Sequence, residues 1–163
     1  AVEGLVEILP RKGVLVSDTN PQKQLLLLEV RRELDRLMAR TGAVRASTDE
    51  REQFKVIADN MEATATARDG VAFMRHDVKF NALLAAACHN EYAKRAMRLI
   101  NGLSRRFWFM HFQRSADLPL CARLHANMAR AIGAGDPEGA AIAADALVDY
   151  VEIFTRATID IAP

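Results

Sequence analysis

The sequence predicts an all-α fold, an antiparallel bundle of about six helices preceded by a short β-hairpin remnant. From residue 20 onward, apolar residues recur at spacings of three and four, which is the period of an amphipathic helix. Capping residues, glycines and prolines divide this pattern into segments joined by short loops, which favour antiparallel neighbours in a bundle. After residue 20 no stretch alternates with a period of two for long.

The N-terminal residues 5–17 contain two short apolar runs that flank Pro10-Arg11-Lys12-Gly13. This pattern is typical of a β-hairpin, in which Gly13 can supply a positive φ in the turn. An isolated two-stranded hairpin is only marginally stable in water. We therefore expect this one to pack on the rest of the protein or to be the remnant of a larger sheet.

The first three helices are expected over 21–41, 48–68 and roughly 70–88. Asn20-Pro21 combines an N-cap candidate with a first-turn proline, and Thr41-Gly42 is expected to end the first helix. Ser47 and Glu50 predict a capping box, and Asp69-Gly70 predicts the next break. The apolar residues expected to point inward are Leu27, Val30, Leu34, Leu37, Met38, Phe54, Ile57, Met61, Met74, Val78, Phe80 and Leu84.

The last three helices are expected over about 91–113, 118–133 and 137–158. Residues 133–138 combine a C-terminal glycine, an N-cap aspartate and a first-turn proline, which is a strong signal for a junction between two helices. The inward residues are expected to be Ala96, Ile100, Leu103, Phe107, Met110, Cys121, His125, Met128, Ile132, Ala144, Leu147, Val151 and Phe154.

Length and charge allow few conclusions about partners. The 163 residues suit one domain, and the formal net charge of +1 argues neither for nor against a nucleic-acid partner. Cys88 and Cys121 form no spaced framework and suit a reducing compartment. No apolar run approaches the length of a membrane span, and the N-terminus lacks a signal-peptide pattern. We therefore expect a cytoplasmic protein without a membrane partner.

Three polar residues fall on faces that should point inward. Asp77 and Asn81 are four apart on the third helix and so share a face, and His125 lies on the apolar stripe of the fifth. Buried polar groups are costly unless paired. One interpretation is a core histidine hydrogen-bonded to a carboxylate. The other is a polar pocket of the kind that helical bundles use for ligands and metals.

Other residues indicate chemistry less clearly. Cys121 and His125 have a spacing that could hold zinc, but a second ligand pair is missing, so a buried thiol is expected. Trp108 and Phe112 belong to a segment rich in arginine and aromatic residues, and they could line a pocket or a subunit interface. The sequence has no glycine-rich phosphate loop, no G-x-S-x-G elbow and no H-E-x-x-H motif, so we expect no enzymatic activity.

Taken in order, these segments resemble the effector-binding (FCD) domain of FadR-type regulators in the GntR superfamily of transcription factors. The resemblance extends from about residue 5 to about 158, and a count of six helices resembles the VanR-like subgroup. Residues 5–16 look like the wing of a winged helix, and Glu29–Asp35 resembles the pattern E-x-R-x-x-L-E. Asp77–Asn81, followed by Leu84 and Asn90, resembles D-x-x-F-H, and His125–Asp136 resembles H-x-x-(I/L)-x-x-A-(I/V)-x-x-x-D.

The resemblance implies a metal site that this sequence keeps only in part. Members of that family often hold a divalent metal with one Asp and three His. Asp77 matches the first ligand and His125 the third, whereas Asn81 and Leu147 stand at the second and fourth positions. Two protein ligands bind a transition metal weakly unless water or an effector completes the shell. We therefore expect weak or absent metal binding, and no other cofactor.

The resemblance also implies how the chain is organised. Residues 1–18 would be the wing remnant of an N-terminal DNA-binding domain whose recognition helix lies upstream of Ala1, and residues 20–160 would be the effector-binding and dimerisation domain. Arg11 and Lys12 would then contact operator DNA in the intact protein, and the protein would be a homodimer.

The implied function is ligand sensing for a bacterial DNA-binding regulator. A small organic acid would fill the bundle cavity and change operator binding allosterically, through different affinities for two states. Two alternatives remain: a metal-dependent protein or enzyme that uses Asp77 and His125, and a purely structural dimerisation module with a filled core. The expected effector-binding residues are Arg31 and Arg105 for the carboxylate, Asp77, Asn81 and His125 as a polar floor, and Trp108 as a wall.

Overall fold

The computed structural model describes residues 6–9, 13–16 and 20–159 of the chain. From Pro21 to Ile159 the described chain forms a bundle of six helices, as the sequence predicts. In chain order, the described elements are β1 (Val6–Leu9), β2 (Gly13–Val16), α1 (Pro21–Arg45), α2 (Thr48–Ala67), α3 (Gly70–Ala87), α4 (Glu91–Ser115), α5 (Leu118–Ala134) and α6 (Pro137–Ile159).

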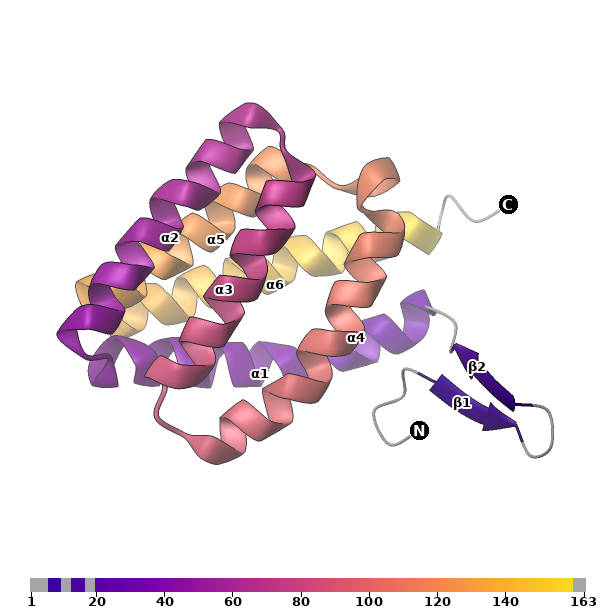
Figure 1. Ribbon diagram of the computed structural model, residues 1–163, viewed down its shortest axis with the longest axis horizontal. Coiled ribbons are helices and arrows are strands. Elements are labelled where there is room, and N and C mark those ends of the chain that lie inside the picture. The colour runs from indigo at the N-terminus through magenta and orange to yellow at the C-terminus, as the bar shows by residue number, and fades with distance from the viewer. Residues whose placement is uncertain (1–5, 10–12, 17–19, 160–163) are drawn as a thin grey trace.

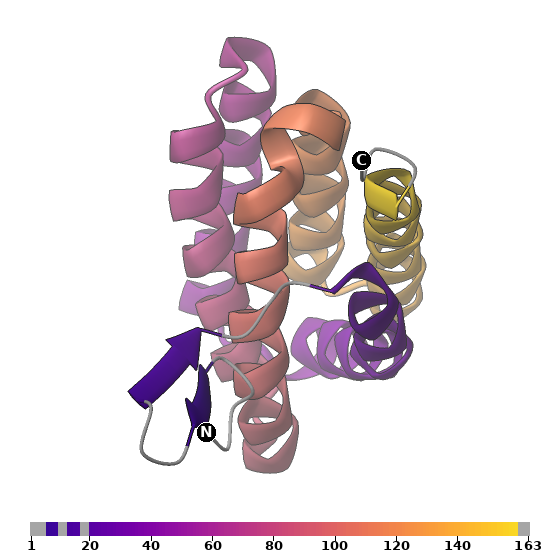
Figure 2. The same ribbon diagram turned by 90° about the vertical axis from the view of Figure 1, so that its right-hand side faces the viewer.

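The bundle is built from helices that pack closely in pairs. The most extensive contacts join α2 to α5 and α1 to α6, and α5 also packs on α6 (Figure 1). Seen from the side, α2 and α3 lie on one flank, α6 lies on the other, and α4 and α5 lie between them (Figure 2). The space enclosed by α3, α4, α5 and α6 is therefore the middle of the molecule. None of the helices that the structure describes is both long and apolar enough to cross a bilayer.

The two strands pair antiparallel, with Val6 opposite Val16 and Leu9 opposite Gly13. They lie beyond the N-terminal end of α1 (Figure 1). Within the described residues their sheet has only these two strands, so the predicted remnant of a larger sheet is not supported. The predicted turn residues Pro10, Arg11 and Lys12 lie outside the described residues, so the assignment of residues 1–18 to a wing stays a prediction.

Short polar side chains start the helices where the sequence predicts them. The Asn20 side chain accepts a hydrogen bond from the backbone N–H of Lys23 at the start of α1. At the start of α2, Ser47 and Glu50 form the predicted capping box, with bonds of 3.2 and 2.8 Å. Gly135 ends α5 in the left-handed conformation, with φ of 74°. Because such caps satisfy the free backbone groups of a helix end locally, sequence alone locates them well.

The predicted end of the first helix is wrong. Helix α1 continues through Thr41 and Gly42 to Arg45. Gly42 is buried and faces the side chains of Ile132 and Leu84, so it serves helix packing rather than termination. The helix stops beside the α3–α4 connection instead, where Arg45 Nη1 donates to the backbone oxygen of Cys88 over 2.9 Å.

Several residues predicted to be inward are exposed. On α4 the predicted Ile100 and Phe107 are buried, but so are Met97, Ser104 and Trp108, which the predicted stripe does not contain. The apolar period predicts that a helix has a buried side, but the helices that pack against it determine how wide that side is. On α4 the buried side includes a polar residue, Ser104. The exposed residues are Val30, Leu37, Val78, Ala96 and Met110.

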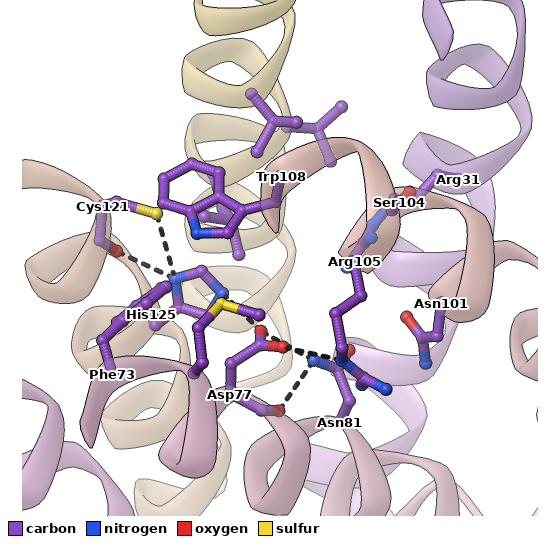
Figure 3. Close-up of a pocket in the computed structure, with 14 residues that line it drawn as sticks. Arg31, Phe73, Asp77, Asn81, Asn101, Ser104, Arg105, Trp108, Cys121 and His125 are labelled. Atoms are coloured by element: carbon purple, nitrogen blue, oxygen red, sulfur yellow. Dashed lines mark hydrogen bonds and ion pairs between the residues drawn. The ribbon is translucent and has the colours of Figure 1, made fainter. Parts of the chain in front are cut away.

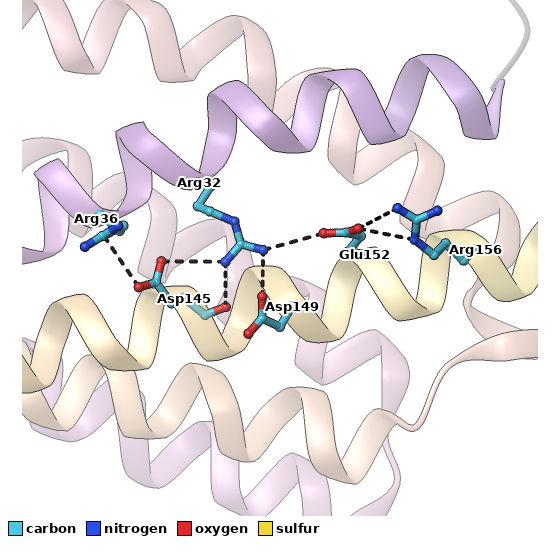
Figure 4. A network of polar contacts seen from close by, with 6 residues as sticks. All are labelled: Arg32, Arg36, Asp145, Asp149, Glu152 and Arg156. Carbon is cyan, nitrogen blue, oxygen red and sulfur yellow. Dashed lines mark hydrogen bonds and ion pairs between the residues drawn. The ribbon is translucent and has the colours of Figure 1, made fainter.

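A ladder of ion pairs joins α1 to α6 along the surface (Figure 4). Arg32 Nη2 lies 2.6 Å from Asp149 Oδ1, and the same guanidinium also reaches Asp145 and Glu152 at 3.6 Å. Arg36 pairs with Asp145 at 3.5 Å. The order of these pairs shows that the two helices are antiparallel, and it fixes the face of α1 that carries the neighbouring residue Arg31.

Candidate functional site

Asp77 on α3 and His125 on α5 form a buried pair in the middle of the bundle (Figure 3). The distance from His125 Nε2 to Asp77 Oδ1 is 3.3 Å, and the two side chains are only 7% and 15% exposed. The rings of Phe73 and Phe80 contact the imidazole edge to face, with centroids 5.3 and 5.7 Å away. These two aromatic contacts help to hold the His125 ring in one orientation.

The hydrogen bonds of His125 define its charge. Its Nδ1 lies 2.8 Å from the backbone oxygen of Cys121, which can only accept, so Nδ1 carries a hydrogen. Its Nε2 faces a carboxylate oxygen, which attracts it only if that nitrogen is protonated too. Burial lowers the pKa of His125, but the hydrogen bond to Asp77 and the charge of Asp77 outweigh burial and raise the pKa overall. At neutral pH the ring is therefore an imidazolium.

Two further groups hold the Asp77 carboxylate. Asn81, one turn later on α3, donates its amide to Asp77 Oδ1 over 2.9 Å and to the Asp77 backbone oxygen over 2.8 Å. Arg105 on α4 places Nε 3.7 Å from Asp77 Oδ2. Burial raises the pKa of Asp77, but the hydrogen bond and charge of His125, with the charges of Arg31 and Arg105, lower it overall. Asp77 is therefore an anion held between cations.

Arg31 brings a third cation into the site from α1. It is 13% exposed and donates from Nε to Asp35 Oδ2 over 3.0 Å, within the same helix. Burial opposes the charge of Arg31, but the carboxylate of Asp35 outweighs burial and raises the pKa. Three cations, Arg31, Arg105 and His125, thus lie near two carboxylates, Asp35 and Asp77. This leaves one positive charge in excess.

These charges surround a cavity of about 50 Å³. Such a volume accommodates a few water molecules or one small polar group, because a water molecule needs roughly 10–15 Å³ of this measure. The structural-module alternative predicts no cavity around His125, and the observed cavity argues against it. The lining residues come from five helices: Arg31, Phe73, Met74, Asp77, Asn81, Asn101, Ser104, Arg105, Trp108, Cys121, His125, Leu147, Val148 and Val151.

Some polar atoms at the cavity have no hydrogen-bond partner within the described part of the chain. They are the donors Trp108 Nε1 and Arg105 Nε and the acceptor Asn101 Oδ1, and all three atoms are buried. The 3.7 Å contact of Arg105 with Asp77 is an ion pair, but it is too long for a hydrogen bond. Buried donors of this kind are costly unless something accepts from them. An anionic group in the cavity would accept from both and would offset the excess charge.

A divalent metal does not fit these residues. Asn81 presents its amide nitrogen, a donor, to Asp77, and Leu147 lines the same cavity with an apolar side chain. His125 Nε2 is paired with Asp77 at 3.3 Å, so a metal would have to displace its proton and break this ion pair before the nitrogen could act as a ligand. Among the described residues, no group of three or more His, Cys, Asp or Glu side chains is placed to hold a metal ion.

Cys121 is a buried thiol that lines the cavity. Its Sγ lies 3.8 Å from His125 Nδ1, and its side chain is almost fully enclosed. Burial raises the pKa of the Cys121 thiol, which therefore stays protonated at neutral pH. Only the thiolate is a good nucleophile or metal ligand, so this residue supplies packing.

The structure brings together all six residues that the sequence proposes for effector binding, at one cavity. Whether they bind a ligand remains a prediction. Sequence reasoning missed Phe73, Met74, Asn101 and Ser104, which also line the cavity. A signal for two of them exists, because Asn101, Ser104 and Trp108 recur at helical spacing and so lie on one face of α4. The proposed DNA contacts Arg11 and Lys12 lie outside the described residues.

Comparison with known proteins agrees with this architecture. The family model described as the FCD domain matches residues 26–150. Among solved structures, Streptococcus agalactiae GntR is similar in fold, with a TM-score of 0.67 and 17% sequence identity, over 93% of this chain and 76% of that chain. A search of the curated proteins found no match.

Proposed function

This chain belongs to the FCD domain family, and from that premise we propose that it is the ligand-sensing domain of a DNA-binding transcriptional regulator. Its ligand is a small organic acid that places an acid group in the cavity between α3, α4 and α5. The observation that carries the proposal is the excess positive charge around that cavity, together with the free donors of Arg105 and Trp108. Solved GntR from Streptococcus agalactiae shares the fold.

The site is built for binding rather than for catalysis. A general base needs a lone pair within reach of the substrate. Both nitrogens of His125 are engaged as donors, and Asp77 is held by Asn81, His125 and Arg105. His125 and Asp77 are therefore fixed by these contacts, and neither residue is free to take a proton from a substrate or to donate one to it.

The route from ligand to DNA runs through α1. Arg31 lines the cavity, and the next residue, Arg32, pairs with Asp149 of α6 on the surface. A ligand that changes the position of Arg31, or that separates α4 from α3, would change how α1 lies along α6.

In the intact protein, α1 leads back to residues 1–18, the proposed wing, with Arg11 and Lys12 near operator DNA. A homodimer in the cytoplasm would place two such domains on one operator. The ligand can shift this arrangement only if it binds one state more tightly.

The proposal is tested first by thermal unfolding of the chain with a panel of small mono- and dicarboxylic acids. We expect at least one acid to raise the melting temperature of the wild type, since a ligand that binds only the folded state stabilises it. Arg105→Gln should abolish the rise. Arg123→Gln, at an exposed α5 position away from the cavity, should retain it. No rise with any acid, or an equal rise in both variants, would refute the proposal.

The second test uses the full-length regulator with its operator. The acid identified in the first test should change operator affinity, and it should have no such effect on the Arg105→Gln regulator. An operator affinity that is the same with and without the acid would rule out a sensing role and leave only binding.

A further inference from the structure

A second and larger hollow adjoins the buried cavity, in the groove between α3 and α4. Its volume is about 560 Å³. On the α3 side, Ala82 and Ala85 are small, which leaves room between the two helices. Asn81, Asn101 and Arg105 line both the groove and the buried cavity, so the two spaces share a wall. In the close-up these three side chains lie near one another (Figure 3).

The α4 side of the groove is strongly basic. Lys94, Arg95 and Arg98 line it together with Arg105, and Glu91 is the one acidic residue in its lining. Lys94, Arg95 and Arg98 are exposed, and within the described residues none of these three forms an ion pair. The lining of the groove thus has four cations and one carboxylate, and its net charge is strongly positive.

The two volumes together limit what a ligand can look like. The buried cavity of about 50 Å³ is too small for a whole metabolite, whereas small-molecule sites usually measure roughly 300–1,000 Å³. The groove of about 560 Å³ falls within that range. A ligand that places one acid group in the cavity therefore extends beyond it. The groove shares Asn81, Asn101 and Arg105 with the cavity, and its volume and the basic side of α4 suit the remainder of such a ligand.

We infer that the ligand carries at least two acid groups and spans both spaces. One carboxylate lies in the cavity beside Arg105, and a second acid group, a carboxylate or a phosphate, lies in the groove against Arg98 and Arg95. Arg98 precedes Arg105 by two helical turns, or about 10 Å along α4, which sets the scale of the separation. This inference rests on the proposed function, which requires only the inner acid group.

Isothermal titration calorimetry with three series of probes tests the inference. The series are linear monocarboxylates, α,ω-dicarboxylates and ω-phosphorylated carboxylates of increasing length. We expect the doubly acidic probes to bind the wild type about tenfold more tightly than monocarboxylates of equal length, because the second acid group accepts charged hydrogen bonds from the groove. The best length should be intermediate, and comparison of the two doubly acidic series identifies the outer group.

The variants separate the inner contact from the outer one. In the double variant Arg95→Gln/Arg98→Gln the preference for doubly acidic probes should disappear, while monocarboxylate binding stays unchanged. Arg114→Gln, an exposed position on α4 outside the groove, should behave like the wild type. If monocarboxylates bind as tightly as diacids, or if the preference survives in the double variant, the inference is wrong and the proposed function stands. If no probe binds at all, both are wrong.

Discussion

At the scale of single residues, the charge of the Asp77 carboxylate determines how the cavity is held together. It faces the imidazolium of His125 at 3.3 Å and the guanidinium of Arg105 at 3.7 Å, and it also accepts from Asn81. Without this carboxylate the buried imidazolium of His125 would have no counter-ion and would repel the guanidinium of Arg105.

We predict that Asp77→Asn lowers the free energy of unfolding by about 3–5 kcal/mol, the usual cost of removing one partner from a buried ion pair. Urea denaturation measures the change. Asp59→Asn is the control, because Asp59 pairs with Arg130 at the surface with its side chain 79% exposed, and its loss should be below about 1 kcal/mol. Equal losses in the two variants would contradict a buried, charged Asp77.

The stability contributed by His125 should decrease in alkaline solution. Its folded pKa lies above the value near 6.5 that an unfolded histidine has. A raised pKa stabilises the fold fully below the unfolded pKa, and the contribution is lost as the pH rises through the folded pKa. The difference in unfolding free energy between wild type and His125→Gln should thus become smaller as the pH rises from about 6.5 to about 9.

Urea denaturation across this pH range measures that difference. His89→Asn provides a control at an exposed histidine, which contacts Glu50 on the surface. The His89→Asn variant should differ from the wild type by less than about 1 kcal/mol, because an exposed ion pair contributes little. A His125→Gln difference that does not shrink as the pH rises would mean that the ring is neutral in the folded protein.

Sequence predicts these polar residues only in part. Asp77, Asn81 and His125 could be assigned to inward faces, because spacing along a helix fixes which side chains share a face. That Arg31 is paired with Asp35 inside α1 was not predicted, although the two are four residues apart. The basic side of the groove was missed as well, since Lys94, Arg95 and Arg98 look like ordinary solvent-exposed charges until α3 is seen beside them.

At the scale of helices, ends fixed by local chemistry were predictable and ends fixed by packing were not. Caps such as Asn20 and Ser47 act within one turn, so their residues identify them. Gly42 carries the same signal as a helix terminator, yet Ile132 of α5 and Leu84 of α3 pack against it and the helix continues. That outcome depends on residues far away in the chain.

We predict that Gly42→Ala stabilises the protein by about 0.5–1 kcal/mol, because an interior glycine costs a helix that much relative to alanine. A Cβ at residue 42 would lie 3.7 Å from Ile132 and 3.8 Å from Leu84, which are ordinary contacts. Thermal or urea unfolding measures the gain. Gly133→Ala is the matched helical control and should destabilise, since its Cβ would lie 3.1 Å from the backbone oxygen of Arg51. A loss in both variants would show that the α1 interface has no room.

At the scale of the whole molecule, five helices meet at one cavity, and the protein neutralises its central carboxylate with its own cations. The resemblance at the sequence level implies a metal ion at this place. Here Arg105 and protonated His125 supply the positive charge, while Asn81 and Leu147 remove two of the expected ligands. The bundle is therefore complete without a cation from solution, and its remaining positive charge favours an anion.

The stability of the whole fold should thus be independent of divalent metal. We predict that neither zinc nor a chelator changes the melting temperature of the wild type, because only a ligand that binds the folded state shifts it. The double variant Asn81→His/Leu147→His, with Asp77 and His125, would have four candidate ligands around one cavity and should gain stability with zinc.

The melting temperature of each variant is compared with and without zinc, so any loss of stability caused by the substitutions themselves cancels. Asn81→His alone serves as a milder variant, and Leu124→His, on α5 but outside the cavity lining, controls for an added histidine. A zinc shift in the wild type as large as that of the double variant would show that Asp77 and His125 suffice for a metal and that their ion pair gives way to it.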